Sequence, residues 1–175
     1  TVVERGSLGG VCLNVGCIPT KALLASSSML MNIREAKSFG INIDGDVNAD
    51  FSAVMGRKDK VVSQLVSGIE FLFEKRGINL VNGFGKLIDK NTVEVTKEDG
   101  SVELVKADKI ILANGSSPII PEMFPYDGKT VITSDEVLAL EELPKSILII
   151  GGGVIGCEIG QFLRTLGTEV TIVEM

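Results

Sequence analysis

The sequence predicts an α/β protein with two βαβ units, the first of them incomplete, and an antiparallel β-meander between the two. The chain opens on TVVER and closes on TIVEM, two apolar strands of the same form that end in Glu4 and Glu174. Because the second strand of a βαβ unit with a glycine-rich first turn ends this way, the repeat indicates two such units. A glycine turn at 151–156 and short β-rich segments at 78–106 complete the pattern.

The composition is that of a globular protein and excludes several kinds of site. The 175 residues are 45% hydrophobic and 23% charged, enough for one domain or for one domain and part of another. Histidine is absent, which excludes a Ser-His-Asp triad, a Cys-His pair and a His-ligated metal within this chain. The net charge of −6 argues against nucleic acid as a partner, and no apolar run reaches the roughly 18 residues of a membrane span.

Helices are expected in the first half of the chain, after a strand at 1–4 and a glycine-rich turn at 6–10. Helix formers and apolar residues at helical spacing predict a helix at 22–37. The segment 51–76 has the strongest amphipathic pattern, and Gly77 ends it.

Short strands follow, with Asp99-Gly100 as the turn between the last two. The segments that predict them are 78–82, 85–89, 92–96 and 102–106. A continuous apolar run at 109–113 predicts one more strand, which leads into a turn of sequence NGSSP.

The rest of the chain contains a linker, a short helix and the start of a second domain. A linker rich in Pro and Gly at 118–129 is followed by a capping box at 133–136, which predicts a short helix. From Lys145 the pattern resets to strand, glycine turn, helix and strand. We therefore expect one domain at 1–145 and the start of another at 146–175.

The glycines of this second domain have the spacing GxGxxG, after a buried strand and at the start of a helix, in the context of a dinucleotide-binding turn. Gly151 permits the tight turn, Gly153 lets the backbone approach a pyrophosphate, and Gly156 lets helix pack on strand. Glu174 can accept hydrogen bonds from ribose hydroxyls and would repel a 2′-phosphate, which favours NAD over NADP. Cys157, just inside the helix, is expected to be a small buried helix residue.

Cys12 and Cys17 lie in the run GGVCLNVGCIPTKALL. A zinc site would lack ligands, because the chain has no second cysteine pair and no histidine. Two independent buried thiols or a redox-active disulfide remain. On an ideal helix the two residues would lie about 7.5 Å apart along the axis, so a disulfide requires a departure from the helix at or before Gly16. Gly16 and Pro19 would permit that departure.

The same run closely resembles the redox-disulfide signature of the flavin disulfide reductases. Its CLNVGC leucine and its tail IPTKALL are most similar to the dihydrolipoamide dehydrogenase branch of that family. The resemblance covers the whole chain but only part of the family's length. It implies a truncated FAD-binding doubly wound domain with a β-meander and the redox disulfide at 1–145. The first βαβ unit of an NAD-binding Rossmann-like domain would follow at 146–175, so the chain would be an internal fragment.

The resemblance also implies a role for each site residue. Cys17 would lie against the flavin as a thiolate, and Cys12 would exchange with the substrate. Lys21 would lie near flavin N5 and, with a carboxylate, tune the flavin, although a solvated helix charge remains the alternative. Glu158 resembles the family glutamate near the nicotinamide. The further FAD contacts would come from turns and strand ends, at Glu4, Gly9, Gly10, Gly85, Ala113, Asn114 and Gly115, with Gly85 alternatively a strand-bend glycine.

Two positions depart from the family pattern. Val11 stands where the family usually has Thr, so it can offer only its backbone to a cofactor. The family's Ala-Thr-Gly turn at the end of a strand is here Ala113-Asn114-Gly115, and Asn tolerates turn geometry.

The activity that the resemblance implies is oxidation of dihydrolipoamide to lipoamide through a Cys12–Cys17 disulfide and FAD, with electrons passed to NAD⁺. The partner would be the lipoyl group of the acyltransferase component of a 2-oxoacid dehydrogenase or glycine cleavage complex. Full-length members are homodimers of the cytoplasm, or of the mitochondrial matrix in eukaryotes. Their catalytic base is a His–Glu pair from the partner subunit's C-terminal domain, which fits the absence of histidine here.

Two alternatives stay open. One is another flavin disulfide reductase of the mercuric or glutathione reductase type, although Glu174 argues against the members that use NADPH. The other is an inactive fragment that binds cofactor weakly, because 175 residues alone are expected to lack activity.

Overall fold

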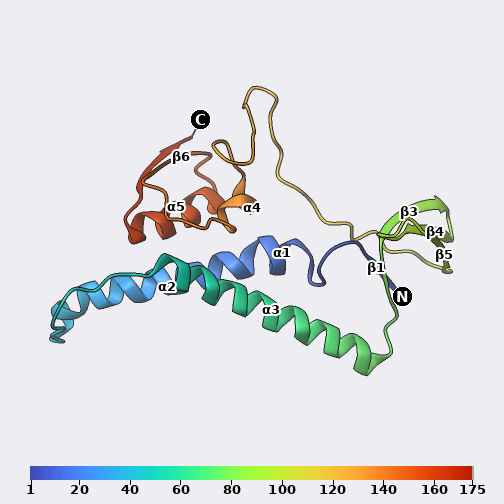
Figure 1. Cartoon of the computed structure of the whole chain (residues 1–175), viewed down its shortest axis with the longest axis horizontal. Coiled ribbons are helices and arrows are strands. Elements are labelled where there is room, and N and C mark those ends of the chain that lie inside the picture. Colours follow the sequence, from blue (N-terminus) through green and yellow to red (C-terminus); the bar gives the residue numbers. More distant parts are fainter. Residues whose placement is uncertain (175) are drawn as a thin grey trace. The chain divides into compact units, whose positions relative to one another are not determined.

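The structure, a computed structural model, describes residues 1–174 and forms two compact units (Figure 1). The first unit consists of Thr1–Asn14 and Ser63–Ser116. The second consists of Val15–Val62 and the chain from Ser117 onward. The long helix α3, Phe51–Arg76, contributes residues to both. The mixed α/β class predicted from the sequence is confirmed.

The first unit contains the opening strand and the meander. Strand β1 (Val2–Glu4) pairs in parallel with β2 (Leu80–Asn82). Strands β3 (Phe84–Asp89), β4 (Thr92–Thr96) and β5 (Val102–Lys106) pair as the predicted antiparallel meander. These three strands lie side by side in the green part of the ribbon in Figure 1.

The strand predicted at 109–113 is not formed, and that prediction is wrong. The segment is irregular, and the side chains of Ile111 and Leu112 are 90% and 72% exposed. A strand needs a neighbour to take up its N–H and C=O groups, and no strand in residues 1–174 pairs with this segment. An apolar run therefore predicts a strand only where a partner strand lies beside it.

One helix of the second unit begins earlier than the apolar pattern predicts, whereas α3 has the predicted bounds. The helix expected at 22–37 is α2 (Cys17–Glu35), followed by the 3₁₀ turn η1 (Ala36–Phe39). The predicted capping box is confirmed ahead of α4 (Ser134–Val137). There the Glu136 carboxylate accepts hydrogen bonds from the N–H of Thr133 at 2.6 Å and from its hydroxyl at 2.8 Å.

The predicted C-terminal βαβ unit is also confirmed. Strands β6 (Ser146–Ile150) and β7 (Glu169–Val173) pair in parallel, and α5 (Val154–Leu166) connects them. Gly167 ends α5 at φ +119°, where its N–H reaches the carbonyls of Leu163 and Arg164.

The apolar core of the second unit joins these helices. Phe162 and Leu163 of α5 are 2% and 0% exposed, and Phe51 of α3 stacks on Phe162 with ring centroids 6.4 Å apart. The buried members of this cluster come from α2, α3, α4 and its C-cap, and α5: Leu23, Met55, Val137, Leu138, Ile159, Phe162 and Leu163. The cluster packs α5 against the helix that begins at Cys17.

Candidate functional site

The two N-terminal cysteines are disulfide-bonded to each other, since Cys157 is the third and remains free. Helix α1 (Gly10–Val15) ends before Gly16, and α2 begins after it. Gly16 has φ −132° and ψ −122°, which is not helical. The departure from ideal helix that the spacing requires is therefore confirmed at Gly16. The possibility of two independent buried thiols is excluded, because Cys12 and Cys17 are bonded and exposed.

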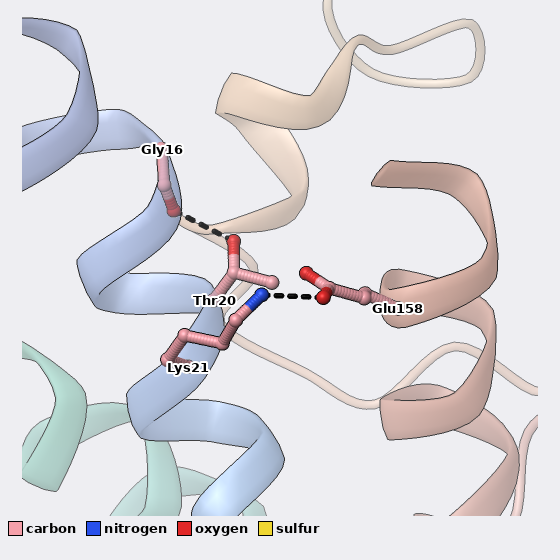
Figure 2. A network of polar contacts seen from close by, with 4 residues as sticks. All are labelled: Gly16, Thr20, Lys21 and Glu158. Atoms are coloured by element: carbon pink, nitrogen blue, oxygen red, sulfur yellow. Dashed lines mark hydrogen bonds and ion pairs between the residues drawn. The ribbon is translucent and has the colours of Figure 1, made fainter. Parts of the chain in front are cut away.

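The first turn of α2 holds Gly16 in place. The hydroxyl of Thr20 donates to the Gly16 carbonyl at 2.7 Å, and the Thr20 N–H donates to the same oxygen at 3.2 Å (Figure 2). No side chain caps this end of α2. Cys17, the first residue of α2, thus lies at the positive end of a 19-residue helix.

Lys21 and Glu158, from segments far apart in the sequence, form an ion pair in the second unit (Figure 2). Lys21 lies one turn after Cys17 on α2, and Glu158 lies near the start of α5. Their side chains are 58% and 25% exposed, and a pair this exposed adds only about 1 kcal/mol or less to stability. Within residues 1–174, the carboxylate that pairs with Lys21 is that of Glu158.

The GxGxxG turn between β6 and α5 has the geometry that its spacing predicts. Gly151 has φ +107°, and a Cβ on Gly156 would lie 2.1 Å from the Gly151 carbonyl oxygen. Gly153 is the N-cap of α5, and no side chain caps that end of the helix. The Gly152 N–H donates to a carboxylate oxygen of Glu174. The turn, the uncapped helix end and the acidic strand end therefore meet, a donor set that suits a pyrophosphate and a ribose.

In the first unit, the turn after β1 is built from glycines with positive φ. Gly9 has φ +106° and Gly10 has φ +66°, which only glycine adopts readily. Glu4 at the end of β1 accepts a hydrogen bond from the Gly6 N–H at 2.8 Å. These φ values account for glycine at both positions.

Asn14 is a site residue that the sequence analysis missed. Its amide donates to the carbonyls of Gly10 at 2.9 Å and Leu8 at 3.1 Å, so it holds the glycine turn against α1. The signal that could have found it is an amide side chain four residues after Gly10, placed to donate back to the carbonyls of the glycine turn.

The remaining predicted residues of the first unit lie in strands and turns. A Cβ on Gly85 would lie 3.1 Å from Val3, so this glycine lets β3 approach β1. Gly115 has φ +74°, and a Cβ there would lie 3.5 Å from the Val11 side chain. Val11, which departs from the family pattern, therefore lies beside the turn that holds the other departure, Asn114. Ala113 and Asn114 are exposed in the irregular segment before Gly115.

The expectation of a buried Cys157 is wrong. Its side chain is exposed, and its thiol donates to the Gly152 carbonyl at 3.1 Å. Cys157 lies on the open face of α5, whereas Ile159, Phe162 and Leu163 face the core.

Two structural findings bear on other kinds of site. In the part of the chain that the structure describes, no group of three or more Cys, Asp or Glu side chains could hold a metal ion. Within residues 1–174 there is also no helix both long and apolar enough to cross a membrane.

Comparison with known proteins gives a consistent set of relatives. A family profile described as pyridine nucleotide-disulphide oxidoreductase matches residues 1–175. The dihydrolipoyl dehydrogenase of Bacillus subtilis is 42% identical over 99% of this chain and 38% of its own length. The mitochondrial dihydrolipoyl dehydrogenase of Dictyostelium discoideum is 47% identical over 99% of this chain and 36% of its length.

A solved structure matches in the same way. The crystal structure of LpdA from Mycobacterium tuberculosis superposes with a TM-score of 0.89 at 26% sequence identity. The match covers 99% of this chain and 38% of that one. The chain therefore spans little more than a third of the length of each of these three relatives.

Proposed function

This chain belongs to the pyridine nucleotide-disulphide oxidoreductase family. We propose that it is part of a dihydrolipoamide dehydrogenase, as its dihydrolipoyl dehydrogenase relatives suggest. The whole protein would oxidise dihydrolipoamide to lipoamide and reduce NAD⁺. The observation that carries this proposal is the Cys12–Cys17 disulfide across the helix break at Gly16. A reducible, exposed disulfide at the start of a helix suits exchange chemistry better than structural support.

The substrate step is a thiol–disulfide exchange at this bond. A thiolate of dihydrolipoamide attacks the Cys12 sulfur, which forms a mixed disulfide and releases Cys17 as a thiolate. The second substrate thiol, after losing its proton, attacks the substrate sulfur of the mixed disulfide. This closes lipoamide and releases Cys12, so the substrate loses two electrons and the protein disulfide gains them.

The position of Cys17 favours it as the leaving thiolate. It is the first residue of the 19-residue helix α2, so the N-terminal end of the helix dipole stabilises its negative charge. Lys21, one turn further along α2, adds a positive charge on the same helix. Cys12 is the third residue of α1, a helix of only six residues.

FAD and NAD are the cofactors that the glycine turns fit. In the first unit, Glu4, Gly9, Gly10, Gly85 and the turn at Ala113, Asn114 and Gly115 would contact FAD. In the second unit, Gly151, Gly153, Gly156 and Glu174 would hold NAD, and Cys17 and Lys21 would face the flavin. When bound, FAD accepts the two electrons of the dithiol and NAD⁺ takes them up as hydride.

The Lys21–Glu158 pair would position charge for this transfer. Glu158 keeps the Lys21 ammonium on the face of α2 that looks toward α5. The pair also links the helix that bears Cys17 to the helix that follows the GxGxxG turn, which supports Glu158 as the family glutamate near the nicotinamide.

The partner of the whole protein would be a lipoyl group on the acyltransferase component of a 2-oxoacid dehydrogenase or glycine cleavage complex. A homodimer in the cytoplasm, or in the mitochondrial matrix of a eukaryote, is the setting that the family resemblance implies, and the relative from Dictyostelium discoideum is described as mitochondrial. We also propose that the domain boundary lies after residue 145, with the FAD-binding domain at 1–145 and the start of the NAD-binding domain at 146–175.

Thiol counting on this chain tests the disulfide. The oxidised chain should titrate one thiol, that of Cys157, and three after reduction. Cys157→Ser is the matched control, which should titrate none when oxidised and two when reduced. Three free thiols regardless of oxidant would overturn the redox proposal.

Turnover tests the substrate. A longer protein that carries this chain should reduce lipoamide with NADH and leave glutathione disulfide unchanged. It should be yellow, and reduction with about two electrons should give a long-wavelength charge-transfer band that Cys17→Ser abolishes and Cys157→Ser retains. Preference for glutathione disulfide and NADPH would instead establish the alternative reductase type.

A further inference from the structure

We propose that Arg34 is a positioning residue that sets the register between α2 and α5 and so brings Lys21 to Glu158. Arg34 lies in the last turn of α2, and its guanidinium donates to the Thr165 carbonyl in the last turn of α5 at 2.8 Å. Lys21 and Glu158 meet near the first turns of the same two helices. The helices therefore run parallel, with one polar contact near each end.

The Thr165 carbonyl is a natural acceptor for this contact. The last four carbonyls of a helix have no partner within it. In α5, the carbonyls of Leu163 and Arg164 accept from the N–H of Gly167, and Leu163 also accepts from Thr168. Arg34 reaches the next carbonyl from another helix, and its positive charge suits the negative end of the α5 dipole.

The apolar contacts between the helices hold their two faces together. Leu23 of α2 belongs to the same buried cluster as Ile159 and Phe162 of α5, and such side chains interdigitate in a small set of registers. The exposed Lys21–Glu158 pair is too weak to hold two long helices in one register. Arg34 supplies a second directional contact at the opposite end, a charge-assisted hydrogen bond that is also exposed, and two contacts at opposite ends specify a register that neither specifies alone.

The two contacts are spaced differently along the two helices. At 1.5 Å per residue, Lys21 and Arg34 lie roughly 20 Å apart along α2, and Glu158 and Thr165 roughly 10 Å apart along α5. The long Lys and Arg side chains bridge this difference. A shift of α2 by one helical turn, about 5.4 Å, would carry both donors in the same direction along α5, so the two contacts could not both keep their present lengths.

Zero-length cross-linking tests the inference on this chain without cofactor or substrate. A water-soluble carbodiimide activates Glu158, and the Lys21 amine then forms an amide only where the two side chains touch. Mass spectrometry of the digest measures the yield of the Lys21–Glu158 peptide. In Arg34→Met the yield should fall about fivefold or more, the scale expected for loss of a charged hydrogen bond.

The matched control is Arg57→Met. Arg57 also donates to a main-chain carbonyl at 2.8 Å, that of Ala22, but it joins α3 to α2 and not α2 to α5. Its loss should leave the cross-link yield unchanged. Arg34→Lys, which keeps a charged donor, should recover part of the yield, and remains informative if Arg34→Met does not fold. The positioning role is overturned if Arg34→Met keeps its helical circular dichroism and cross-links like the unchanged chain.

The inference rests on the proposed function only for the role of the Lys21–Glu158 pair in electron transfer. The cross-link reports the register itself, so it stands or fails separately from turnover. In a protein with turnover, Arg34→Met should lower the rate of hydride exchange with NAD⁺ at saturation and leave the thiol count of the oxidised protein unchanged.

Discussion

Glu4 ends strand β1 and Glu174 directly follows strand β7, in nearly the same local sequence, but the two carboxylates are held differently. Glu4 accepts from the N–H of Gly6, two residues along its own turn. Glu174 accepts from the N–H of Gly152, in the loop that follows the neighbouring strand β6. The same local pattern thus gives the same strand end in both places, and the neighbouring loop decides which donor the carboxylate meets.

The packing around the two strand ends differs as well. Strand β7 lies beside β6 in a unit whose helix α5 buries Phe162 and Leu163 almost completely. The first unit buries only Leu8, Val81 and Val95 among its apolar side chains, whereas the cluster of the second unit joins four helices. Each unit leaves one isoleucine 90% exposed, Ile111 in the first and Ile119 in the second. The stability of this chain should therefore depend mainly on the second unit.

The largest expected effect comes from removing the core of the second unit. Phe162→Ala should lower the free energy of unfolding by about 3–5 kcal/mol, because it leaves a cavity beneath α5. In the first unit, Ile111→Ser should change it by no more than about 0.5 kcal/mol, because that side chain is already in water. Urea denaturation followed by circular dichroism measures both, and similar losses would contradict the contrast between the units.

A smaller difference in stability is expected between Gly→Ala variants of the two glycine turns. Gly156→Ala should cost about 1–3 kcal/mol or more, since its Cβ would overlap the Gly151 carbonyl, a backbone atom that cannot rotate away. Gly10→Ala meets no atom within 4 Å and should cost only about 1–2 kcal/mol, from its positive φ. Thermal unfolding of the two variants tests the ranking, and a costlier Gly10→Ala would reverse it.

The smallest effects should come from two exposed aspartates, one in each unit. The N–H groups of Lys129, Val131 and Thr130 lower the pKa of Asp127 to about 2. The hydroxyl and N–H of Ser101 also lower the pKa of Asp99. Because the folded pKa is depressed, each carboxylate stabilises the fold above its unfolded pKa of about 4. That stabilisation is lost as the pH falls through the folded pKa.

Melting temperatures measured between pH 7 and pH 2 test the stabilisation by these two aspartates. Asp127→Ala should melt lower than the unchanged chain at pH 7, with the difference disappearing toward pH 2. Asp99→Ala should show the same trend with a smaller difference, because its carboxylate accepts from a single residue. A pH-independent difference for Asp127→Ala would rule out the charge as its cause.

Much of the fold could be predicted because its signals are local. The meander, the capping box at Thr133 and the GxGxxG unit each depend on a few neighbouring residues. The break at Gly16 could also be predicted, because disulfide geometry and helix geometry are incompatible at a five-residue spacing. The strand at 109–113 could not, because an apolar run does not reveal whether another strand pairs with it.

The candidate site also divides into features set by local sequence and features set by long-range packing. The sequence by itself determined the cysteine pair, the glycine turns and the acidic strand ends, since each requires only particular residue types at short spacing. Tertiary structure alone decided that Glu158 is the carboxylate for Lys21, that Arg34 reaches Thr165, and that Cys157 is exposed. These are contacts between residues more than a hundred positions apart, or the choice of which helix face is buried. Both follow from how α2 packs on α5, which no local pattern specifies.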